Sequence, residues 1–591
     1  MKRLLRVILL ISGLASTTAL AQDGGALFLD RCAGCHDGGL DRAPSRASLG
    51  EMSAERVLAA METGPMISMA SGRSAADRRA IAEFITGKKL TGVIPDAPLP
   101  QAMCPAGPSP DFSKILWEGW GQNKSNTRFQ DTKRAGMTAD QVPRLKVKWA
   151  FGFPGEQTSN GAITLAGGRL FVGSPAGKVY SLDAVTGCIH WYFQAAAIRG
   201  AVRIERVGSG YIAFFGDNTA TVYALDASTG KLLWKAKVDD YPQARVTGSI
   251  AFHNGRLYVP LASGEEVASV PATYECCRFR GSVVSLDAAT GKQIWKTYTI
   301  PEEPKAVGKN TNGVQRFAPA GGGVWNSPTI DPARHALYIG TGDAYTLPAA
   351  NTTDAIIAMD LNTGKILWSI QDTGNDAWLA GCNGATPAEN CPKELGPDHD
   401  FGAPPILKTL PGGRTILVAG QKSGNVWAHD PDNQGKVIWK TALVNNTSEF
   451  GGKIVWGGAV DDQNAYFGLG PGGIAAVQLR DGERKWFTQP ELAPAMAQHP
   501  GHEGPLTAIP GIVFSGGWDG ILRALSASDG KIVWQYNTIQ EFTTVNGVTA
   551  KGGSMGAAGP VVAGGVLFVP SGYVGVRNGI PGNVLLALGV Q

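Results

Sequence analysis

The first residues with an evident chemistry are two cysteines and a histidine, in the segment Cys32-Ala33-Gly34-Cys35-His36. Two thiols separated by two residues and followed directly by histidine form a covalent haem-attachment motif, in which the histidine ligates the iron. We therefore expect a c-type haem on Cys32 and Cys35, with His36 as the proximal ligand. A redox or zinc-binding cysteine pair is the alternative interpretation, and the adjoining histidine disfavours it.

Methionine is a common second axial ligand of electron-transfer haems. Met66 follows Gly64-Pro65 in an expected loop, at a distance from the next helix that resembles small cytochromes. We predict Met66 as the distal ligand, with Met69 as the second candidate. Met61 falls on the apolar face of an expected helix and is assigned to the core.

The first 21 residues have the features of a secretory signal peptide. Lys2, Arg3 and Arg6 form a basic start, an apolar run follows, and Ala19-Leu20-Ala21 provides a cleavage site. A retained anchor is the alternative, but small and polar residues interrupt the apolar run, which is short for a membrane span. No later segment has 18 consecutive apolar residues, so we expect a periplasmic protein with no membrane span after cleavage.

Composition excludes some partners. The formal net charge of +4 falls to +1 (4 minus 3) when the three basic residues of the signal peptide are removed. Such a chain is not expected to bind nucleic acid or anionic membranes. The 79 glycines occur in short clusters, as at 167–168 and 321–323, and this pattern predicts many short strands joined by turns.

An even number of cysteines in an exported protein favours disulfide pairing. Eight are present, and the haem motif uses two. The other six divide into Cys382–Cys391 within one loop, the vicinal pair Cys276–Cys277 and, by elimination, Cys104–Cys188.

Beyond residue 112 the sequence repeats itself. Each copy has an apolar strand, a turn of the type Leu-Asp-Ala-x-Thr-Gly, and a strand that ends in tryptophan. Clear copies span 181–191, 224–234 and 285–295, and weaker ones end at Trp368, Trp439, Trp486 and Trp534. Spacings between successive tryptophans are 42 to 48 residues at both ends but 61 to 73 in the middle. A propeller blade needs about 40 to 50 residues, so we expect long functional loops in the middle blades.

Two half-repeats complete the count. Trp149 ends a strand that lacks the preceding turn, and 584–588 form a strand that lacks a following tryptophan. Together they would close an eighth blade. The predicted fold is an all-β eight-bladed propeller preceded by a small all-α cytochrome c domain. The predicted boundaries are 1–21 signal peptide, 22–90 cytochrome c domain, 91–112 proline-rich linker and 113–591 propeller.

An eight-bladed propeller of such repeats resembles the quinoprotein alcohol dehydrogenases, which use pyrroloquinoline quinone (PQQ) and calcium. The resemblance covers the chain after the linker. A preceding cytochrome, the segment 117–122 (Trp-Glu-Gly-Trp-Gly-Gln) and the segment 276–281 (Cys-Cys-Arg-Phe-Arg-Gly) are similar to the cytochrome-containing polyvinyl alcohol dehydrogenases within that family.

The resemblance implies a binding site for PQQ and calcium after the strand 257–260. Ser263-Gly264-Glu265-Glu266 is similar to a family motif in which serine and glycine hold a PQQ carboxylate and glutamate binds calcium. It implies Thr247, Ser263 and Gly264 as cofactor contacts and Glu266 as a calcium ligand, with Glu265 the alternative. Two exposed loop carboxylates are the structural alternative.

The family also places a vicinal disulfide against one face of the quinone. Cys276–Cys277 would do this here, and Arg280 resembles a neighbouring arginine that contacts the cofactor. A tryptophan covers the other face in the family, where this chain offers Phe317 at best. A purely structural bridge is the alternative for the cysteines.

Three further roles follow from the resemblance. Where the family has an asparagine on calcium, this chain has Val324, and Asn326 two residues later is the candidate ligand. Asp354, after the segment Gly340-Thr341-Gly342-Asp343, is assigned as catalytic base and calcium ligand, with Asp343 as its rival and a turn role as the alternative. Lys422 would stabilise charge at the quinone oxygen, unless it is a solvated turn lysine.

The implied activity is the oxidation of an alcohol to a carbonyl by PQQ and calcium, with electrons passed to haem c and then to an external acceptor such as a soluble cytochrome or quinone. Secondary alcohols, with polyvinyl alcohol first, are the expected substrates. Another bulky alcohol is one alternative. A non-catalytic propeller with a cytochrome, serving electron transfer or binding, is the other, because a propeller scaffold by itself implies no activity.

Overall fold

The structure is a computed structural model that describes residues 23–37, 43–62, 66, 69–70, 73–90, 100–383, 387–444, 453–574 and 579–590. The predicted signal peptide and the first part of the predicted linker lie outside the described residues. Within them, no helix is long and apolar enough to cross a membrane.

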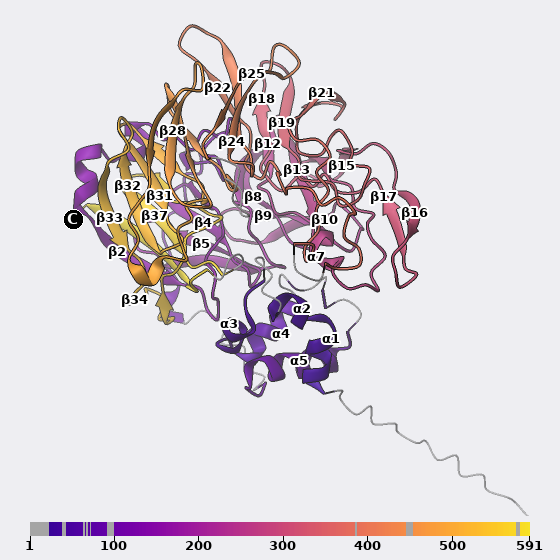
Figure 1. The fold of residues 1–591 in the computed structure, drawn as a ribbon. Helices are drawn as coiled ribbons and strands as arrows, with labels where there is room; N and C mark the ends of the chain where they lie inside the picture. The colour runs from indigo at the N-terminus through magenta and orange to yellow at the C-terminus, as the bar shows by residue number, and fades with distance from the viewer. Residues whose placement is uncertain are drawn as a thin grey trace, which may run out of the picture.

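Helices occupy the N-terminal segment, as the sequence predicts (Figure 1). They are α1 (Gly24–Arg31), α2 (Ala33–His36), α3 (Arg46–Gly50), α4 (Ala54–Glu62) and α5 (Ala75–Thr86). Ser74 and Asp77 form a capping box at the start of α5, and Gly87 ends it with φ 64°. Leu27, Met61 and Ile81 belong to one buried cluster against which Met66 packs. The assignment of this segment as a cytochrome c domain stays a prediction.

The remainder of the chain is an eight-bladed β-propeller, which confirms the predicted architecture (Figure 1). Each blade is a four-stranded antiparallel core. Blade 1 contains β3 (Ile163–Ala166), β4 (Arg169–Gly173), β5 (Lys178–Asp183) and β6 (Ile189–Gln194), and blade 2 contains β7 (Arg203–Val207), β8 (Gly210–Gly216), β9 (Thr221–Asp226) and β10 (Leu232–Lys237). Blade 3 contains β12 (Ala251–His253), β13 (Arg256–Ser263), β14 (Ser282–Asp287) and β15 (Gln293–Tyr298). Blade 4 contains β18 (Thr329–Asp331), β19 (Ala336–Gly340), β20 (Ala355–Asp360) and β21 (Ile366–Gln371).

Blades 5 to 8 repeat the same order of strands. Blade 5 contains β22 (Ile406–Thr409), β23 (Thr415–Gly420), β24 (Asn425–Asp430) and β25 (Lys436–Ala442), and blade 6 contains β26 (Ala459–Val460), β27 (Asn464–Gly468), β28 (Ile474–Gln478) and β29 (Arg484–Thr488). Blade 7 contains β30 (Thr507–Ile509), β31 (Ile512–Gly516), β32 (Ile521–Ser526) and β33 (Ile532–Asn537). Blade 8 contains β36 (Val561–Ala563), β37 (Val566–Ser571), β38 (Val584–Val590) and β2 (Leu145–Gly152).

The ring closes as the half-repeats predict. Strand β2, from the N-terminal side of the propeller, pairs antiparallel with β38 at the C-terminus, from Leu145 opposite Val590 to Gly152 opposite Val584. Blade 8 therefore joins both ends of the propeller sequence. Because those ends are held in one sheet, the pairing of β2 with β38 closes the ring.

Neighbouring blades are held together by tryptophan and glycine. Trp191 donates from its ring nitrogen to the carbonyl oxygen of Ala227 at 3.0 Å, and a Cβ on Gly230 would come within 2.7 Å of the Trp191 ring. Gly230 has φ 72°, which glycine adopts without strain. Six other pairs show the same close approach: Trp149 with Gly187, Trp234 with Gly291, Trp295 with Gly364, Trp368 with Gly435, Trp439 with Gly482 and Trp486 with Gly530. The repeated tryptophans are therefore packing residues between blades.

A segment before the ring runs past the first strands of several blades. Backbone hydrogen bonds join Lys124 to blade 4, Ser125 to blade 5, Thr127 to blade 6 and Arg128 to blade 7. The buried Arg128 guanidinium also donates to the carbonyl oxygens of Leu506 and Pro560. This segment therefore ties consecutive blades together.

Shorter elements fill the connections. Before the ring these are η1 (Pro100–Ala102), β1 (Ile115–Trp117), α6 (Thr132–Ala135) and η2 (Ala139–Arg144). Between and within blades they are β11 (Ala244–Arg245), α7 (Glu265–Ala268), β16 (Lys305–Lys309), β17 (Gln315–Ala318), η3 (Pro494–Met496), β34 (Glu541–Phe542) and β35 (Ala550–Lys551). All three predicted disulfides are present: Cys104–Cys188, Cys276–Cys277 and Cys382–Cys391.

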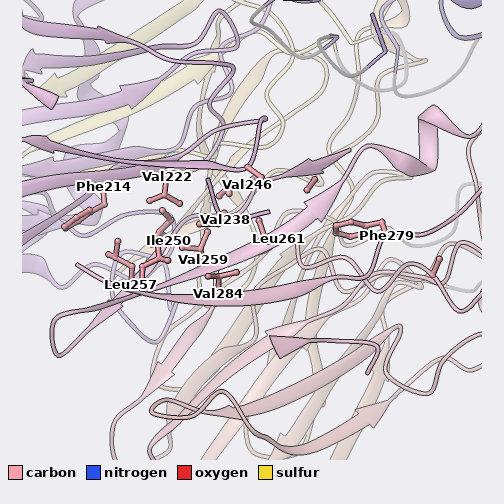
Figure 2. Close-up of a cluster of buried hydrophobic side chains, with 14 of the residues drawn as sticks. Phe214, Val222, Val238, Val246, Ile250, Leu257, Val259, Leu261, Phe279 and Val284 are labelled. Carbon is pink, nitrogen blue, oxygen red and sulfur yellow. The ribbon is translucent and has the colours of Figure 1, made fainter. Parts of the chain in front are cut away.

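The core lies between blades, where aliphatic side chains of adjacent sheets interlock. Figure 2 shows the cluster between blades 2 and 3, in which Val222, Leu257 and Val284 are fully buried. Phe279 belongs to the same cluster and lies at one end of the group drawn. Its ring stacks against Tyr345 of blade 4 with centroids 6.5 Å apart. The core thereby reaches the loops that hold the candidate site.

Candidate active site

The long connections of blades 3 to 5 bring several acidic side chains together around one lysine. Lys422, in the turn between β23 and β24, is 4% exposed. Its Nζ donates to Asp398 Oδ1 and to Asp400 Oδ2, both at 2.5 Å. Both aspartates belong to the long connection between β21 and β22. Lys422 is therefore a buried, doubly paired cation, and not a solvated turn residue.

Asp354 lies beside this group with no partner of its own. It is fully buried, and neither carboxylate oxygen accepts a hydrogen bond within the described part of the chain. Burial raises the pKa of Asp354 well above its usual range; Asp376 and Asp400 raise it further, whereas Lys422 lowers it. Its φ of 49° is unusual for a residue with a side chain. An unpartnered, strained carboxylate of this kind is typical of functional sites.

Asp343 is a second buried carboxylate with capacity for a ligand. One oxygen each of Asp343, Asp398 and Asp400 lie within 4.8 Å of one another. Oδ2 of Asp343 has no hydrogen-bond partner among the described residues. Burial, followed by the charges of Asp400 and Glu266, raises the pKa of Asp343 well above its usual range. A cation bound here would relieve this repulsion, and carboxylate oxygens are the donors that a hard divalent cation prefers.

Asp376 anchors the acidic loop. Its carboxylate accepts hydrogen bonds from the backbone nitrogens of His399, at 2.7 Å, and Asp398, at 3.2 Å. Burial raises the pKa of Asp376 to about 6, despite the hydrogen bond from His399. Asp376 therefore fixes the backbone that presents Asp398 and Asp400.

The two adjacent glutamates have different roles. Glu265 is fully buried, and its carboxylate accepts hydrogen bonds from the hydroxyls of Tyr241 and Tyr274 and from the backbone nitrogens of Arg278 and Phe279. Glu266 instead lies close enough to Asp343 for its negative charge to raise the pKa of that carboxyl group. The geometry favours Glu266 over Glu265 as a metal ligand.

The Asn326 side chain is hydrogen-bonded to backbone groups on both sides, and its predicted role as a metal ligand stays a prediction. Its amide nitrogen donates to the carbonyl oxygens of Gly340 and Phe401, at 2.8 and 2.7 Å, and its oxygen accepts from the backbone nitrogen of Gly340. The side chain is used to join loops of blades 4 and 5. Val324 is fully buried and apolar.

Arg280 and Phe317 face a different cavity from the acidic group. Arg280 donates to the carbonyl oxygens of Ile300 and Pro301 and lies over the ring of Tyr298. The guanidinium carbon of Arg278 lies over Phe317, 3.7 Å from the centroid of the phenyl ring. These residues line a cavity of about 280 Å³ that contains none of the five aspartates above or Lys422. The contacts of Arg280 and Phe317 with the quinone stay predictions.

The cysteine pair lies next to Phe317, which lines the cavity described above. Cys276 and Cys277 are fully buried in the core cluster that also contains Phe279 and Tyr345. The Cys276 carbonyl accepts a hydrogen bond from the Phe317 nitrogen. The role predicted for this disulfide at the quinone ring stays a prediction.

Sequence reasoning missed two tryptophans at the convergence of the blades. Trp325 directly precedes Asn326 in the segment before blade 4, and Lys422 Nζ lies 5.3 Å from its ring centroid. Trp456 of blade 6 meets it edge to face at 5.4 Å. Their cavity is also lined by Arg199 and Thr247. Their position in the repeat could have indicated this difference: both tryptophans precede the first strand of a blade, whereas the repeat tryptophans lie within a last strand.

The haem motif has one supporting contact. His36 is 7% exposed, and its Nδ1 lies 2.7 Å from the carbonyl oxygen of Pro44. This contact orients the ring and leaves Nε2 for an iron ligand. Met66 packs against the helical core, as does Met61. The haem assignments of Cys32, Cys35, His36 and Met66 stay predictions.

Two protein-family models match the propeller. The model described as outer membrane protein assembly factor BamB matches residues 131–307 and 371–578. The model of the β-propeller domain of glucose, ethanol and alcohol dehydrogenases matches residues 260–440. The second match includes Glu266, Asp343, Asp354 and Lys422. Fold and site thus define a PQQ-dependent alcohol dehydrogenase.

Curated relatives narrow this class. A polyvinylalcohol dehydrogenase from a Pseudomonas species is 42% identical over 608 residues, covering 96% of this chain and 94% of the relative. Another, from Sphingopyxis sp. (strain 113P3), is 39% identical over 614 residues, covering 96% and 93%. The chain belongs to the polyvinyl alcohol dehydrogenase family.

Solved structures agree on the fold. The quinohemoprotein alcohol dehydrogenase of Comamonas testosteroni superposes with a TM-score of 0.60 at 17% identity, covering 81% of each chain. The corresponding enzyme of Pseudomonas putida gives 0.59 at 16% identity, covering 80% of each. At these identities the likeness establishes the propeller fold alone.

Proposed function

We propose that the chain oxidises secondary alcohol groups to ketones, with polyvinyl alcohol as the first substrate, through PQQ and calcium in the periplasm. Electrons then pass to its own haem c and onward to an external acceptor such as a soluble cytochrome or quinone. The substrate proposal rests on the two polyvinylalcohol dehydrogenase relatives. Export rests on the signal-peptide features of the first 21 residues.

The observation that carries the proposal is the buried, unpartnered carboxylate of Asp354 beside Asp343, Asp398, Asp400 and Lys422. Isolated buried charges are costly unless a ligand compensates them. A cation would supply that compensation, and an alcohol would supply a hydrogen-bond donor. The orphaned oxygens of Asp343 and Asp354 therefore fit a site for a metal and a hydroxyl substrate.

Glu266 and Asp343 are the proposed calcium ligands, with Asp398 and Asp400 within reach of the same ion. We do not retain Asn326, because backbone groups occupy its amide. Asp354, which the resemblance also implies as a ligand, is proposed instead to face the substrate, because no group among the described residues donates a hydrogen bond to its oxygens. When bound, PQQ and calcium supply a two-electron acceptor and a Lewis acid.

Asp354 is the proposed catalytic base. Its carboxylate would accept the proton of the substrate hydroxyl, and PQQ, when bound, would supply the acceptor for the two electrons that the carbinol group loses. The raised pKa of Asp354 gives it a stronger affinity for that proton than an exposed aspartate has. Lys422, held by Asp398 and Asp400, places a positive charge over Trp325, where negative charge on a neighbouring oxygen would be stabilised.

The experiment follows the haem spectrum of purified, haem-loaded protein while PQQ, calcium and an alcohol are added. Polyvinyl alcohol and a small secondary alcohol are compared with a primary alcohol. We expect haem reduction that requires all three components and is fastest with secondary alcohols. Failure of every alcohol to reduce the haem, in protein shown to bind PQQ, would contradict the proposed function.

A further inference from the structure

A cavity of about 280 Å³ lies at one end of blade 3, outside the acidic group around Lys422. Its walls come from the connection after β10, the connection between β13 and β14, the end of β15 and the hairpin of β16 and β17. Four aromatic rings and two guanidinium groups line it: Tyr241, Phe279, Tyr298, Phe317, Arg278 and Arg280. All of these residues except Phe279 are exposed at least in part, so a large ligand can reach the cavity from the solvent.

Arginines cover two of the rings. The guanidinium carbon of Arg280 lies 3.9 Å from the ring centroid of Tyr298, and that of Arg278 lies 3.7 Å from the ring centroid of Phe317. A guanidinium stacked on a ring presents N–H donors at the edge of a flat, weakly hydrated surface. Such a surface suits a ligand with both hydrocarbon and hydroxyl groups, because the hydrocarbon packs on the flat face and the hydroxyl oxygens accept from the donors.

The charges around the cavity are balanced. Three ion pairs achieve this: Arg278 with Glu275 at 2.9 Å, Arg280 with Glu303 at 3.9 Å, and Lys296 with Asp239 at 2.7 Å. An anion bound here would meet carboxylates as well as guanidinium groups, so a neutral ligand fits better. The Tyr298 hydroxyl has no hydrogen-bond partner among the described residues, and a ligand with hydroxyl groups can supply one.

One layer of side chains separates this cavity from the candidate metal site. Phe279, which lies at one end of the cluster in Figure 2, lines the cavity and stacks on Tyr345. Tyr241 also lines the cavity, and its hydroxyl donates to Glu265, the residue before Glu266. A small alcohol can occupy one of the two places at a time. A long chain of hydroxyl-bearing units can lie at both.

We propose that this cavity binds a segment of polyvinyl alcohol away from the carbinol that is being oxidised. The inference rests on the proposed function and adds a second binding place for the same substrate. Polyvinyl alcohol is neutral and alternates hydrocarbon with hydroxyl groups, which matches the balanced charges, the rings and the free donor of Tyr298. The two relatives at 42% and 39% identity are named for this polymer. The cavity increases affinity for the polymer and leaves small alcohols unaffected.

The first test compares the KM of two substrates in haem-loaded enzyme with PQQ and calcium. The variants are Tyr298→Leu, Tyr298→Phe and Arg278→Gln; Arg280 and Phe317 are kept, because the resemblance implies them as quinone contacts. For a polyvinyl alcohol oligomer, KM should rise by about three- to tenfold in Tyr298→Leu and Arg278→Gln, and by less in Tyr298→Phe, which keeps the ring. KM for isopropanol and kcat for both substrates should equal those of wild type.

The second test measures binding without turnover. Calorimetric titration of the same oligomer into cofactor-free protein should show the same order of affinities, since the cavity lies outside the quinone site. Arg484→Gln is the matched control, because Arg484 also lies over a ring, that of Phe487 at 6.0 Å, on the exposed last strand of blade 6. It should change neither KM nor Kd. Melting temperature establishes that each variant folds, and Tyr298→Phe serves if Tyr298→Leu does not fold.

The outcomes separate this inference from the proposed function. If folded Tyr298→Leu and Arg278→Gln bind the oligomer as tightly as wild type, the cavity is not a polymer site and the enzyme proposal stands. An equal rise of KM for isopropanol would also overturn the inference, because it would place the effect at the quinone site. Equal affinity of the cavity for a soluble glucan of similar length would overturn the assignment to polyvinyl alcohol. Failure of every alcohol to reduce the haem would contradict the proposed function, and the titration would then decide the cavity alone.

Discussion

Asp354 shows at the residue scale how burial without partners prepares a group for chemistry. We expect Asp354→Asn to lower kcat by about 10²- to 10⁴-fold, the contribution of a general base. PQQ binding should persist, because the carboxylate is not among the groups proposed to hold the cofactor. Steady-state kinetics and dialysis on the same preparation separate the two. A variant that retains more than half of kcat would show that another group, such as Asp343, takes the proton.

The same substitution should stabilise the metal-free protein. An acid whose pKa is raised on folding binds its proton more tightly in the folded chain than in the unfolded chain. Stability therefore falls as pH rises above the ordinary value of 3.8 towards the raised pKa of Asp354. Asp354→Asn lacks this loss, so its free energy of unfolding at pH 7 should exceed that of wild type by about 1–3 kcal/mol. Urea unfolding at pH 4 and pH 7 measures the difference.

Asp360 provides the control with the opposite sign. Burial raises the pKa of Asp360, but hydrogen bonds from Thr363 and Asn362 outweigh it, and the net shift is downward. Its charged form stabilises the fold above the ordinary pKa, and this contribution is lost as pH falls through the lowered one. Asp360→Asn should therefore destabilise the protein at pH 7. The same sign of change for both variants would contradict our account of Asp354.

Glu265 and Glu266 form a matched pair for a second prediction. Glu265→Gln should lower the free energy of unfolding by about 2–4 kcal/mol, because four donors converge on its buried carboxylate. Glu266→Gln should cost less stability than Glu265→Gln and should weaken calcium binding instead. Urea unfolding and calorimetric titration of calcium distinguish them. Loss of calcium affinity in Glu265→Gln at full stability would reverse the assignment.

How far the sequence predicted the site depended on how closely each residue followed a local motif. Lys422 lies in the turn directly after β23, and Glu266 lies in the short helix α7 directly after β13, so a neighbouring strand fixes the place of each residue. Asn326 and Arg280 lie in long connections, where nearby carbonyl groups compete for their donors. Asp398 and Asp400 come from a connection with no repeat signal, so only the folded chain could place them at Lys422.

At the scale of elements, the fold was predictable because each blade repeats one local solution. The turn of the type Asp-x-x-x-Gly and the tryptophan of the last strand recur, and seven of the eight tryptophans meet the turn glycine of the next blade. The sequence did not predict the route of 118–130, because its contacts join blades far apart in the chain. Periodicity predicts what is local, and single-copy segments depend on tertiary contacts.

A third prediction isolates the contact between tryptophan and glycine. Gly291→Ala should destabilise the protein more than Gly255→Ala. Both glycines have a positive φ, 72° and 75°, so alanine should cost each about 1–2 kcal/mol in backbone strain. A Cβ on Gly291 would also come within 2.6 Å of the Trp234 ring, whereas a Cβ on Gly255 has nothing within 4 Å. The additional loss should be about 1–3 kcal/mol.

Urea unfolding of the two variants measures that additional loss directly. Trp234→Phe should reduce the difference between them, because the smaller ring leaves space for the new methyl group. Equal destabilisation by both glycine substitutions would show that the tryptophans do not determine how closely neighbouring blades approach.

At the scale of the whole molecule, one buried ion pair joins the N-terminal helices to the propeller. Arg56 of α4 donates to Glu156 Oε2 at 2.5 Å, and their side chains are 10% and 2% exposed. The other oxygen of Glu156 accepts from the backbone nitrogen of Ala176 at 2.6 Å, which fixes the carboxylate to blade 1. Glu156 and Ala176 lie in connections on the same face of the ring as the connections that carry Asp343 and Lys422. The pair therefore holds the haem motif on the face of the proposed quinone site.

The fourth prediction is that Arg56→Gln slows haem reduction without slowing alcohol oxidation. It rests on the proposed function. Without the pair, the helices are held less firmly to the propeller, and their effective concentration at the quinone site falls. We expect single-turnover haem reduction to slow by about tenfold, in proportion to that concentration. Turnover with a phenazine dye that takes electrons directly should match wild type.

Lys89→Gln, which removes an exposed pair with Glu83 inside the helical segment, should change neither rate. Equal slowing of both reactions by Arg56→Gln would place its effect at the quinone site, and an unchanged rate of haem reduction would show that the linker alone is sufficient to position the haem.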